Sequence, residues 1–231
     1  MTIPAAKPVL YTVGHSTRSL DEFMTLLLSA GLRQVVDVRT IPRSRRNPQF
    51  NGTTLAIALQ NQGLVYRHLQ GLGGLRHARP DSVNLGWRNP SFRGFADYMQ
   101  TRDFAEALEV LLALAVEAPT VIMCAEALPW RCHRFLIADA LVVRAFPVEH
   151  LMSPGVSRAH SLHPLAVVDN RLVRYPNPSR DGPPAGGAEG SSLRNTGNEN
   201  SPCSGTGFPA LSTPGAGAPA APYPAELSQR E

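Results

Sequence analysis

Side chains that can carry out covalent and acid–base chemistry are concentrated in one short segment, residues 124–134 (CAEALPWRCHR). It contains Cys124 and Cys132, and a cysteine becomes a nucleophile when positive charge or a helix N-terminus lowers the pKa of its thiol. It also contains Glu126 and His133, which can transfer protons. The segment therefore predicts a catalytic site.

Several interpretations of the cysteines are open. The arginines that follow Cys124 could make its thiol acidic, although cysteine phosphatases and rhodaneses place an arginine nearer to the cysteine than Arg131 is here. Cys124 could equally be a small buried residue at the end of a strand. A zinc site could use Cys124, Cys132, His133 and His15, but the spacing matches neither a Cys-x-x-Cys pair nor the zinc deaminase pattern, so we expect no bound metal.

The charged residues of the segment also allow two interpretations each. Glu126 could be a general base or orient a histidine, or it could form an ion pair with Arg134 or Arg39. His133 could titrate near neutral pH, or cap and pack a helix. Arg134, beside free backbone N–H groups at a predicted helix start, would suit an anion.

Two further groups of polar residues follow predicted strands. Gly14, His15 and Ser16 form a turn whose glycine lets a ligand approach the backbone and whose side chains can hydrogen-bond a phosphate. Asp37 and Arg39 follow the next strand, where we assign both to the anion site and where Asp37 could fix the tautomer of His15. Alternatively, Asp37 and Arg39 form a structural ion pair beside a histidine that clamps a loop.

The loop after Arg39 is strongly basic. It contains RSRR at 43–46, in which we assign Arg43 and Ser44 to anion binding. Such a loop beside an anion site suits a phosphate or a nucleic-acid backbone. It could also be a solvated loop without a ligand.

Composition divides the 231-residue chain into two parts. Residues 1–175 carry 19 Lys plus Arg against 13 Asp plus Glu, a net charge of +6. Residues 176–231 contain 10 Pro and 9 Gly, with few large apolar side chains to offset the entropy of folding. We therefore expect one domain over 1–175 and a disordered tail over 176–231.

Short apolar runs rich in β-branched residues alternate with segments of helical periodicity. This alternation predicts an α/β fold: an open, mostly parallel sheet of about five strands with helices on both faces. A small C-terminal hairpin or edge pair within 165–175 is expected to be appended to that sheet. The strands are expected at 9–13, 34–38, 64–69, 120–124 and 148–151, and the helices at 19–30, 53–62, 95–99, 104–118 and 132–143.

The polar groups described above all follow strands of this sheet, and ligands of open parallel sheets bind at the carboxyl ends of the strands.

The segments TVGHS, DVRTIPRS, LGGL and CAEALPWRCHR together resemble the bacterial and archaeal family called domain of unknown function 488, over about Tyr11 to Tyr175. The resemblance implies an α/β fold with an active site built from these motifs, and it implies no particular activity or cofactor.

We expect an enzyme that acts on a phosphate-bearing or nucleotide-like anion at this edge. Two alternatives are open: a non-catalytic module that binds nucleic acid or nucleotides, and a thiol-dependent sulfur or redox protein.

The sequence has no apolar stretch long enough to cross a membrane and no signal peptide, and its three cysteines form no disulfide framework. A cytoplasmic protein is therefore expected.

Overall fold

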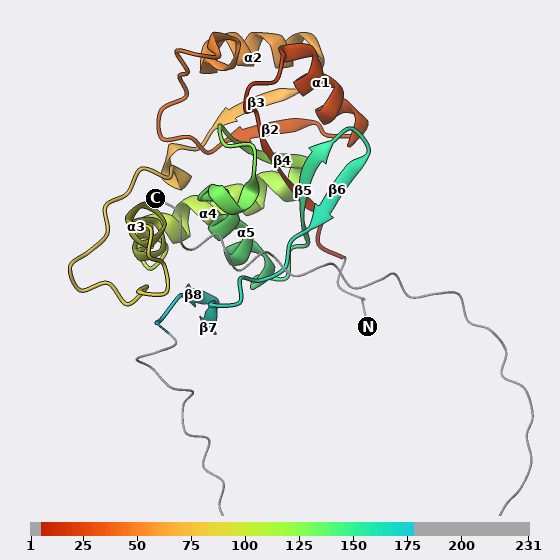
Figure 1. Cartoon of the computed structure of the whole chain (residues 1–231). Helices are drawn as coiled ribbons and strands as arrows, with labels where there is room; N and C mark the ends of the chain where they lie inside the picture. Colours follow the sequence, from red (N-terminus) through yellow and green to blue (C-terminus); the bar gives the residue numbers. More distant parts are fainter. Residues whose placement is uncertain (1–5, 178–231) are drawn as a thin grey trace, which may run out of the picture.

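The computed structural model describes residues 6–177. A six-stranded sheet lies at its centre, in the order β3-β2-β4-β1-β5-β6 (Figure 1). Five strands are parallel, and β6 pairs antiparallel with β5. The strands are β1 Leu10–Gly14, β2 Gln34–Asp37, β3 Val65–His68, β4 Thr120–Cys124, β5 Val148–Ser153 and β6 Val156–Ala159.

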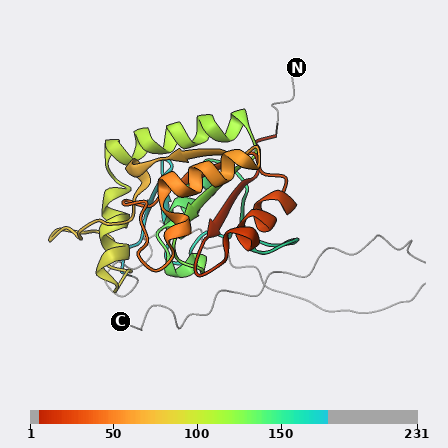
Figure 2. The same cartoon turned by 90° about the horizontal axis from the view of Figure 1, so that it is seen from above.

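Helices cover both faces of the sheet, as Figures 1 and 2 show. One face packs against the first two helices, and the other against the fourth and fifth, with the third beside them. The helices are α1 Leu20–Ser29, α2 Gly52–Asn61, α3 Pro90–Tyr98, α4 Arg102–Glu117 and α5 Arg134–Val142, and short 3-10 turns occur at Pro48–Phe50, Gln70–Leu72 and Pro129–Arg131.

Local sequence explains how the first of these helices forms. Ser19 caps α1 and Glu22 completes the capping box, so two backbone N–H groups of the first turn have partners. Phe23 and Leu27 recur at helical spacing and are fully buried in the core between α1, α2 and the sheet. The helix is thereby fixed against the strands whose ends carry the polar loops.

The predicted fold class is confirmed, with one addition. The sheet has a sixth strand, β6, which the sequence did not predict because its residues VSRA form no apolar run and three of the four are exposed. The C-terminal hairpin forms, as β7 Val167–Asp169 and β8 Leu172–Arg174, in a sheet of its own.

The expected tail over 176–231 lies outside the described residues except for its first two. No helix of residues 6–177 is long and apolar enough to span a membrane.

A buried chain of polar side chains ties the C-terminal segment to the sheet. Asp139 accepts hydrogen bonds from Nε2 of His160 at 2.8 Å and from the hydroxyl of Tyr175 at 2.6 Å. His160 Nδ1 therefore accepts from His150 Nε2 at 3.0 Å, and His150 Nδ1 accepts from Thr12 at 2.7 Å. Each ring nitrogen of His150 and His160 thus has a partner.

Acidification is expected to destabilise the fold through its buried histidines. Burial lowers the pKa of His150 to about 3 and that of His15 to about 4, below the unfolded value of about 6.5. Each ring thus stabilises the fold above pH 6.5, and this stabilisation is lost as the pH falls toward 4, by about 1.4 kcal/mol per pH unit for each proton. The free energy of unfolding, measured in urea between pH 7 and pH 5, should depend less steeply on pH in His150→Gln than in the wild type. The exposed-residue control His77→Gln should keep the pH dependence of the wild type. An unchanged slope for His150→Gln would refute this assignment.

Candidate functional site

A cavity of about 670 Å³ opens at the carboxyl end of the central strands. The loops after β1, β2 and β4 form much of its wall, because these strands are neighbours in the sheet. The connections after β1 and β4 lead to helices on opposite faces, the arrangement that leaves a crevice in open α/β sheets. Among the residues proposed from the sequence, His15, Ser16, Arg39, Arg43, Ser44, Cys124, Glu126, Cys132 and His133 line the cavity, whereas Gly14, Asp37 and Arg134 do not.

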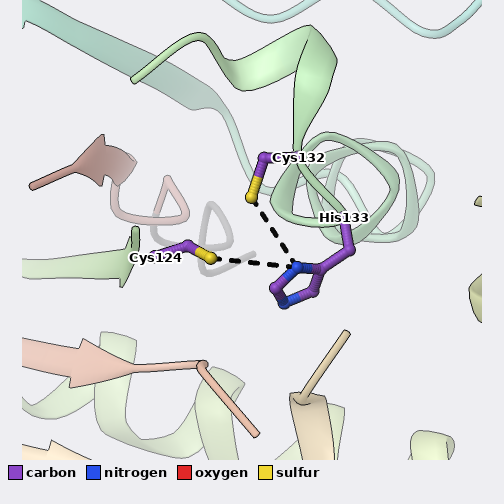
Figure 3. A group of neighbouring side chains, drawn as sticks. All are labelled: Cys124, Cys132 and His133. Atoms are coloured by element: carbon purple, nitrogen blue, oxygen red, sulfur yellow. Dashed lines mark hydrogen bonds between the residues drawn. The ribbon is translucent and has the colours of Figure 1, made fainter. Parts of the chain in front are cut away.

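Two cysteines and a histidine meet at this cavity (Figure 3). Cys124 is the last residue of β4, and Cys132 and His133 directly precede α5. The Nδ1 atom of His133 lies 3.6 Å from Sγ of Cys132 and 3.9 Å from Sγ of Cys124. All three atoms lie within 4.8 Å of one another, so they form one cluster.

The orientation of the His133 ring is set by the backbone. Its Nε2 lies 3.1 Å from the carbonyl oxygen of Val38, which can only accept a hydrogen bond. The neutral ring therefore carries its hydrogen on Nε2 and presents the Nδ1 lone pair to the two sulfurs. Phe95 packs against the ring edge, with centroids 5.0 Å apart. A Cβ at Gly74 would lie 2.4 Å from Nδ1, so glycine keeps the space beside this nitrogen free.

The two thiols affect each other's ionisation. Burial raises the pKa of Cys132, but its hydrogen bonds with Cys124 and His133 and the positive charge of Arg134 outweigh burial, so the pKa lies well below its usual value. The pKa of Cys124 is raised well above its usual value by its hydrogen bond to Cys132 and by burial. The pair thus holds one negative charge more readily than two.

Asp37 and Arg39 form a buried ion pair beside the cavity. Arg39 Nη2 lies 2.5 Å from Oδ2 of Asp37, and the two side chains are 6% and 0% exposed. Arg39 also donates to the carbonyl oxygen of Phe50 at 2.8 Å, and Asp37 accepts from the hydroxyl of Tyr66 at 2.8 Å. These are the contacts of a structural ion pair, which was the alternative that the sequence left open for Asp37 and Arg39.

His15 is also held by neighbouring groups. Its Nδ1 donates to the carbonyl oxygen of Ser16 at 2.9 Å, so Nε2 accepts from Arg39 at 3.3 Å. The ring stacks on Phe50 with centroids 4.3 Å apart. Because burial lowers its pKa to about 4, His15 is neutral at pH 7. Both ring nitrogens are thus engaged in holding the turn after β1.

Arg134 fixes the loop that carries the cluster. Its guanidinium, 1% exposed, donates to the carbonyl oxygens of Glu126 at 2.5 Å and of Ala127 at 2.8 Å. This loop passes so close to Gly14 that a Cβ there would lie 1.8 Å from the Glu126 carbonyl oxygen. The Glu126 side chain is itself exposed, at the cavity rim. Anion binding by Arg134 and Gly14, predicted from the sequence, stays a prediction, while their contacts in the fold are structural.

Comparison with known protein families matches residues 19–141 of the chain to the family described as domain of unknown function DUF488. The chain belongs to this family. The matched residues include Asp37, Arg39 and the whole cluster of Cys124, Cys132 and His133. No curated protein and no solved structure matches the chain.

Four arginines of this DUF488 protein line the cavity, and their side chains make no hydrogen bond or ion pair to another residue of 6–177. All four are exposed, and the only carboxylate among the cavity-lining residues is that of Glu126. Ser44 shapes the loop, since its hydroxyl accepts from the backbone of Asn47 at 3.0 Å and its own N–H donates to Asn51 at 2.8 Å. The arginines are Arg43, Arg45, Arg46 and Arg131.

Sequence reasoning missed the backbone contributions to the DUF488 site. The carbonyl of Val38 orients His133, and no side-chain motif marks a carbonyl. Gly74 lies against the His133 ring, and its neighbour Leu75 donates its N–H to Thr40 at 3.1 Å. The LGGL motif at 72–75 was the available signal, because paired glycines indicate a close backbone approach.

Proposed function

We propose that this DUF488 protein is an enzyme that acts on a phosphate-bearing or nucleotide-like anion. The observation that carries the proposal is a single cavity that combines a cysteine–histidine cluster with four arginines whose side chains have no partner among residues 6–177. Its volume of about 670 Å³ suits a small-molecule ligand. The reaction class that we propose is hydrolysis or group transfer.

The arginines explain why the substrate should be an anion. A guanidinium offers a planar fork of N–H donors that matches phosphate oxygens. Arg43, Arg45 and Arg46 come from the loop after β2, and Arg131 comes from the turn before α5, so positive charge reaches the cavity from two segments. Four positive charges against the single carboxylate of Glu126 give a field that favours an anionic ligand.

The cluster explains why the protein should be a catalyst. His133 and the two thiols are the reactive groups that the fold itself positions, through Val38 and through the fixed loop of Arg134. Glu126 has an exposed carboxylate on the rim and is our candidate for proton transfer with bulk water. A substrate held by the arginines would place its reacting bond between Glu126 and the cluster.

Removing two of the loop arginines is expected to weaken anion binding. We expect Arg43→Ala/Arg46→Ala to bind inorganic pyrophosphate at least about tenfold less tightly, because each charge-assisted hydrogen bond contributes about 1.5–3 kcal/mol and the rim is solvated. Isothermal titration calorimetry at low salt measures this. The matched control is Arg33→Ala/Arg67→Ala: both residues are exposed and neither lines the cavity.

The same titration separates the proposal from its alternatives. Equal pyrophosphate affinity in the two double variants, or no binding by the wild type, would contradict an anion site in this cavity. If a single-stranded oligonucleotide instead binds tightly, with log affinity falling steeply against log salt and no turnover of nucleotides, the protein is a nucleic-acid-binding module.

A further inference from the structure

We propose that Cys124, Cys132 and His133 bind one Zn²⁺ ion and leave a fourth coordination position open to the arginine-lined cavity. This inference deepens the proposed function, because it names the reactive centre of the site, and its catalytic meaning rests on that function. It differs from our expectation from sequence spacing, which favoured no metal.

The separations suit one ion. Zinc bonds of about 2.3 Å to sulfur and about 2.0 Å to nitrogen, in a tetrahedron, place sulfur and nitrogen about 3.6 Å apart and two sulfurs about 3.8 Å apart. Nδ1 of His133 lies 3.6 Å and 3.9 Å from the two sulfurs, and no pair among the three atoms exceeds 4.8 Å. Side-chain movements of about 1 Å or less would therefore bring all three atoms to bonding distance of a common centre.

The His133 ring is already oriented as in a metal site. A histidine ligand binds through a nitrogen lone pair and commonly donates its other ring N–H to a backbone carbonyl or a carboxylate. Here Nε2 donates to Val38 and Nδ1 faces the sulfurs. Nδ1 is also the ring nitrogen nearer to the main chain, which allows His133 and its neighbour Cys132 to reach the same ion.

Rigid elements hold the three residues. Cys124 ends β4, a fully buried strand, and is paired in register with Gly14 of β1. Its carbonyl accepts from the N–H of His15 at 2.9 Å, and Arg134 holds the loop between the two cysteines. A preorganised ligand set of this kind needs little ordering to bind a metal.

The donor set favours zinc among common cations. Two thiolates and an imidazole are the soft and borderline ligands that Zn²⁺ binds, whereas Mg²⁺ and Ca²⁺ require oxygen ligands. Three protein ligands with an open position are typical of catalytic zinc sites, and there the ion activates a bound water and polarises a substrate oxygen. Two thiolates would also neutralise the charge of the ion, so the four arginines would still attract an anion.

Metal content and spectroscopy test the inference on the full chain. Every protein carries Cys203→Ser, which removes the one cysteine outside the described residues. We expect one Zn²⁺ per chain after dialysis against metal-free buffer. Replacing the zinc with Co²⁺ should give the visible bands of a tetrahedral site and thiolate-to-cobalt charge transfer. We expect Cys124→Ser, Cys132→Ser and His133→Asn each to weaken Co²⁺ binding at least about 100-fold, and the exposed-residue control His77→Asn to leave it unchanged.

X-ray absorption of the zinc-loaded protein needs no variant and keeps the test decisive if a variant misfolds. Two sulfur neighbours near 2.3 Å and one imidazole nitrogen near 2.0 Å are expected. A protein that binds no zinc or cobalt, or binds them equally well in the three variants, overturns the inference. If either metal result is found while Arg43→Ala/Arg46→Ala still weakens pyrophosphate binding, the proposed anion site stands and the reactive centre is a thiol. A wild-type protein that binds zinc but does not bind pyrophosphate would instead contradict the proposed function alone.

Discussion

Asp37→Asn is expected to lower the free energy of unfolding by about 3–5 kcal/mol, because it leaves the buried guanidinium of Arg39 without a counter-charge. Asp37 is fully buried and accepts hydrogen bonds from Arg39 and Tyr66. The free energy needed to desolvate Arg39 is therefore recovered only while the carboxylate is present. Urea denaturation at pH 7 measures the loss.

An exposed ion pair provides the control for this substitution. Arg79 and Asp81 form a pair at 2.8 Å, but their side chains are 61% and 69% exposed. Asp81→Asn should leave the free energy of unfolding nearly unchanged, since solvent screens such pairs. If the two substitutions cost the same, the ion pair of Asp37 and Arg39 does not carry the structural role that we assign to it.

Cys132→Ser is expected to reduce turnover at least about 100-fold, because it removes a sulfur of the cluster, whether that sulfur is a nucleophile or a metal ligand. Serine is nearly isosteric, so the loop and α5 should remain in place. The assay uses nucleoside mono-, di- and triphosphates and bis-p-nitrophenyl phosphate as substrates, with products separated by chromatography. Cys203→Ser should retain the wild-type rate.

Stability measurements decide between a catalytic and a structural Cys132. When both proteins are metal-free, the catalytic role predicts a melting temperature within a few degrees of the wild type and unchanged affinity for pyrophosphate, since Cys132 is not an anion ligand. Wild-type turnover by Cys132→Ser, or a collapse of the fold that accounts for the lost rate, would contradict that role.

Much of the fold could be predicted because its signals are local. The five parallel strands follow from apolar runs such as 120–124, and α1 follows from Ser19 and the spacing of Phe23 and Leu27. The strand β6 could not be predicted, since an edge strand with exposed polar residues carries no hydrophobic pattern. The hairpin was placed correctly, but its separation from the main sheet depends on long-range packing of Val173 and Tyr175.

For the site, the sequence identified which residue types could react but not which partners they have. Arg39, Arg134 and Arg43 look alike in the sequence. Only the fold shows that Arg39 is engaged by Asp37, that Arg134 is engaged by loop carbonyls, and that the Arg43 side chain has no partner among the described residues. Likewise, the spacing of Cys124 and Cys132 matches no compact metal motif, yet the turn between them brings both sulfurs to one nitrogen of His133.

The most direct test of the central claim, that the arginines and the cluster form one anion site, is a crystal structure of the protein grown with pyrophosphate. We expect one pyrophosphate in the cavity, within hydrogen-bond distance of about 3 Å of at least two of Arg43, Arg46 and Arg131, with a phosphoryl group facing Cys124 and His133. Pyrophosphate bound only outside the cavity, or a cavity that stays free of it at saturating concentration, would contradict the claim.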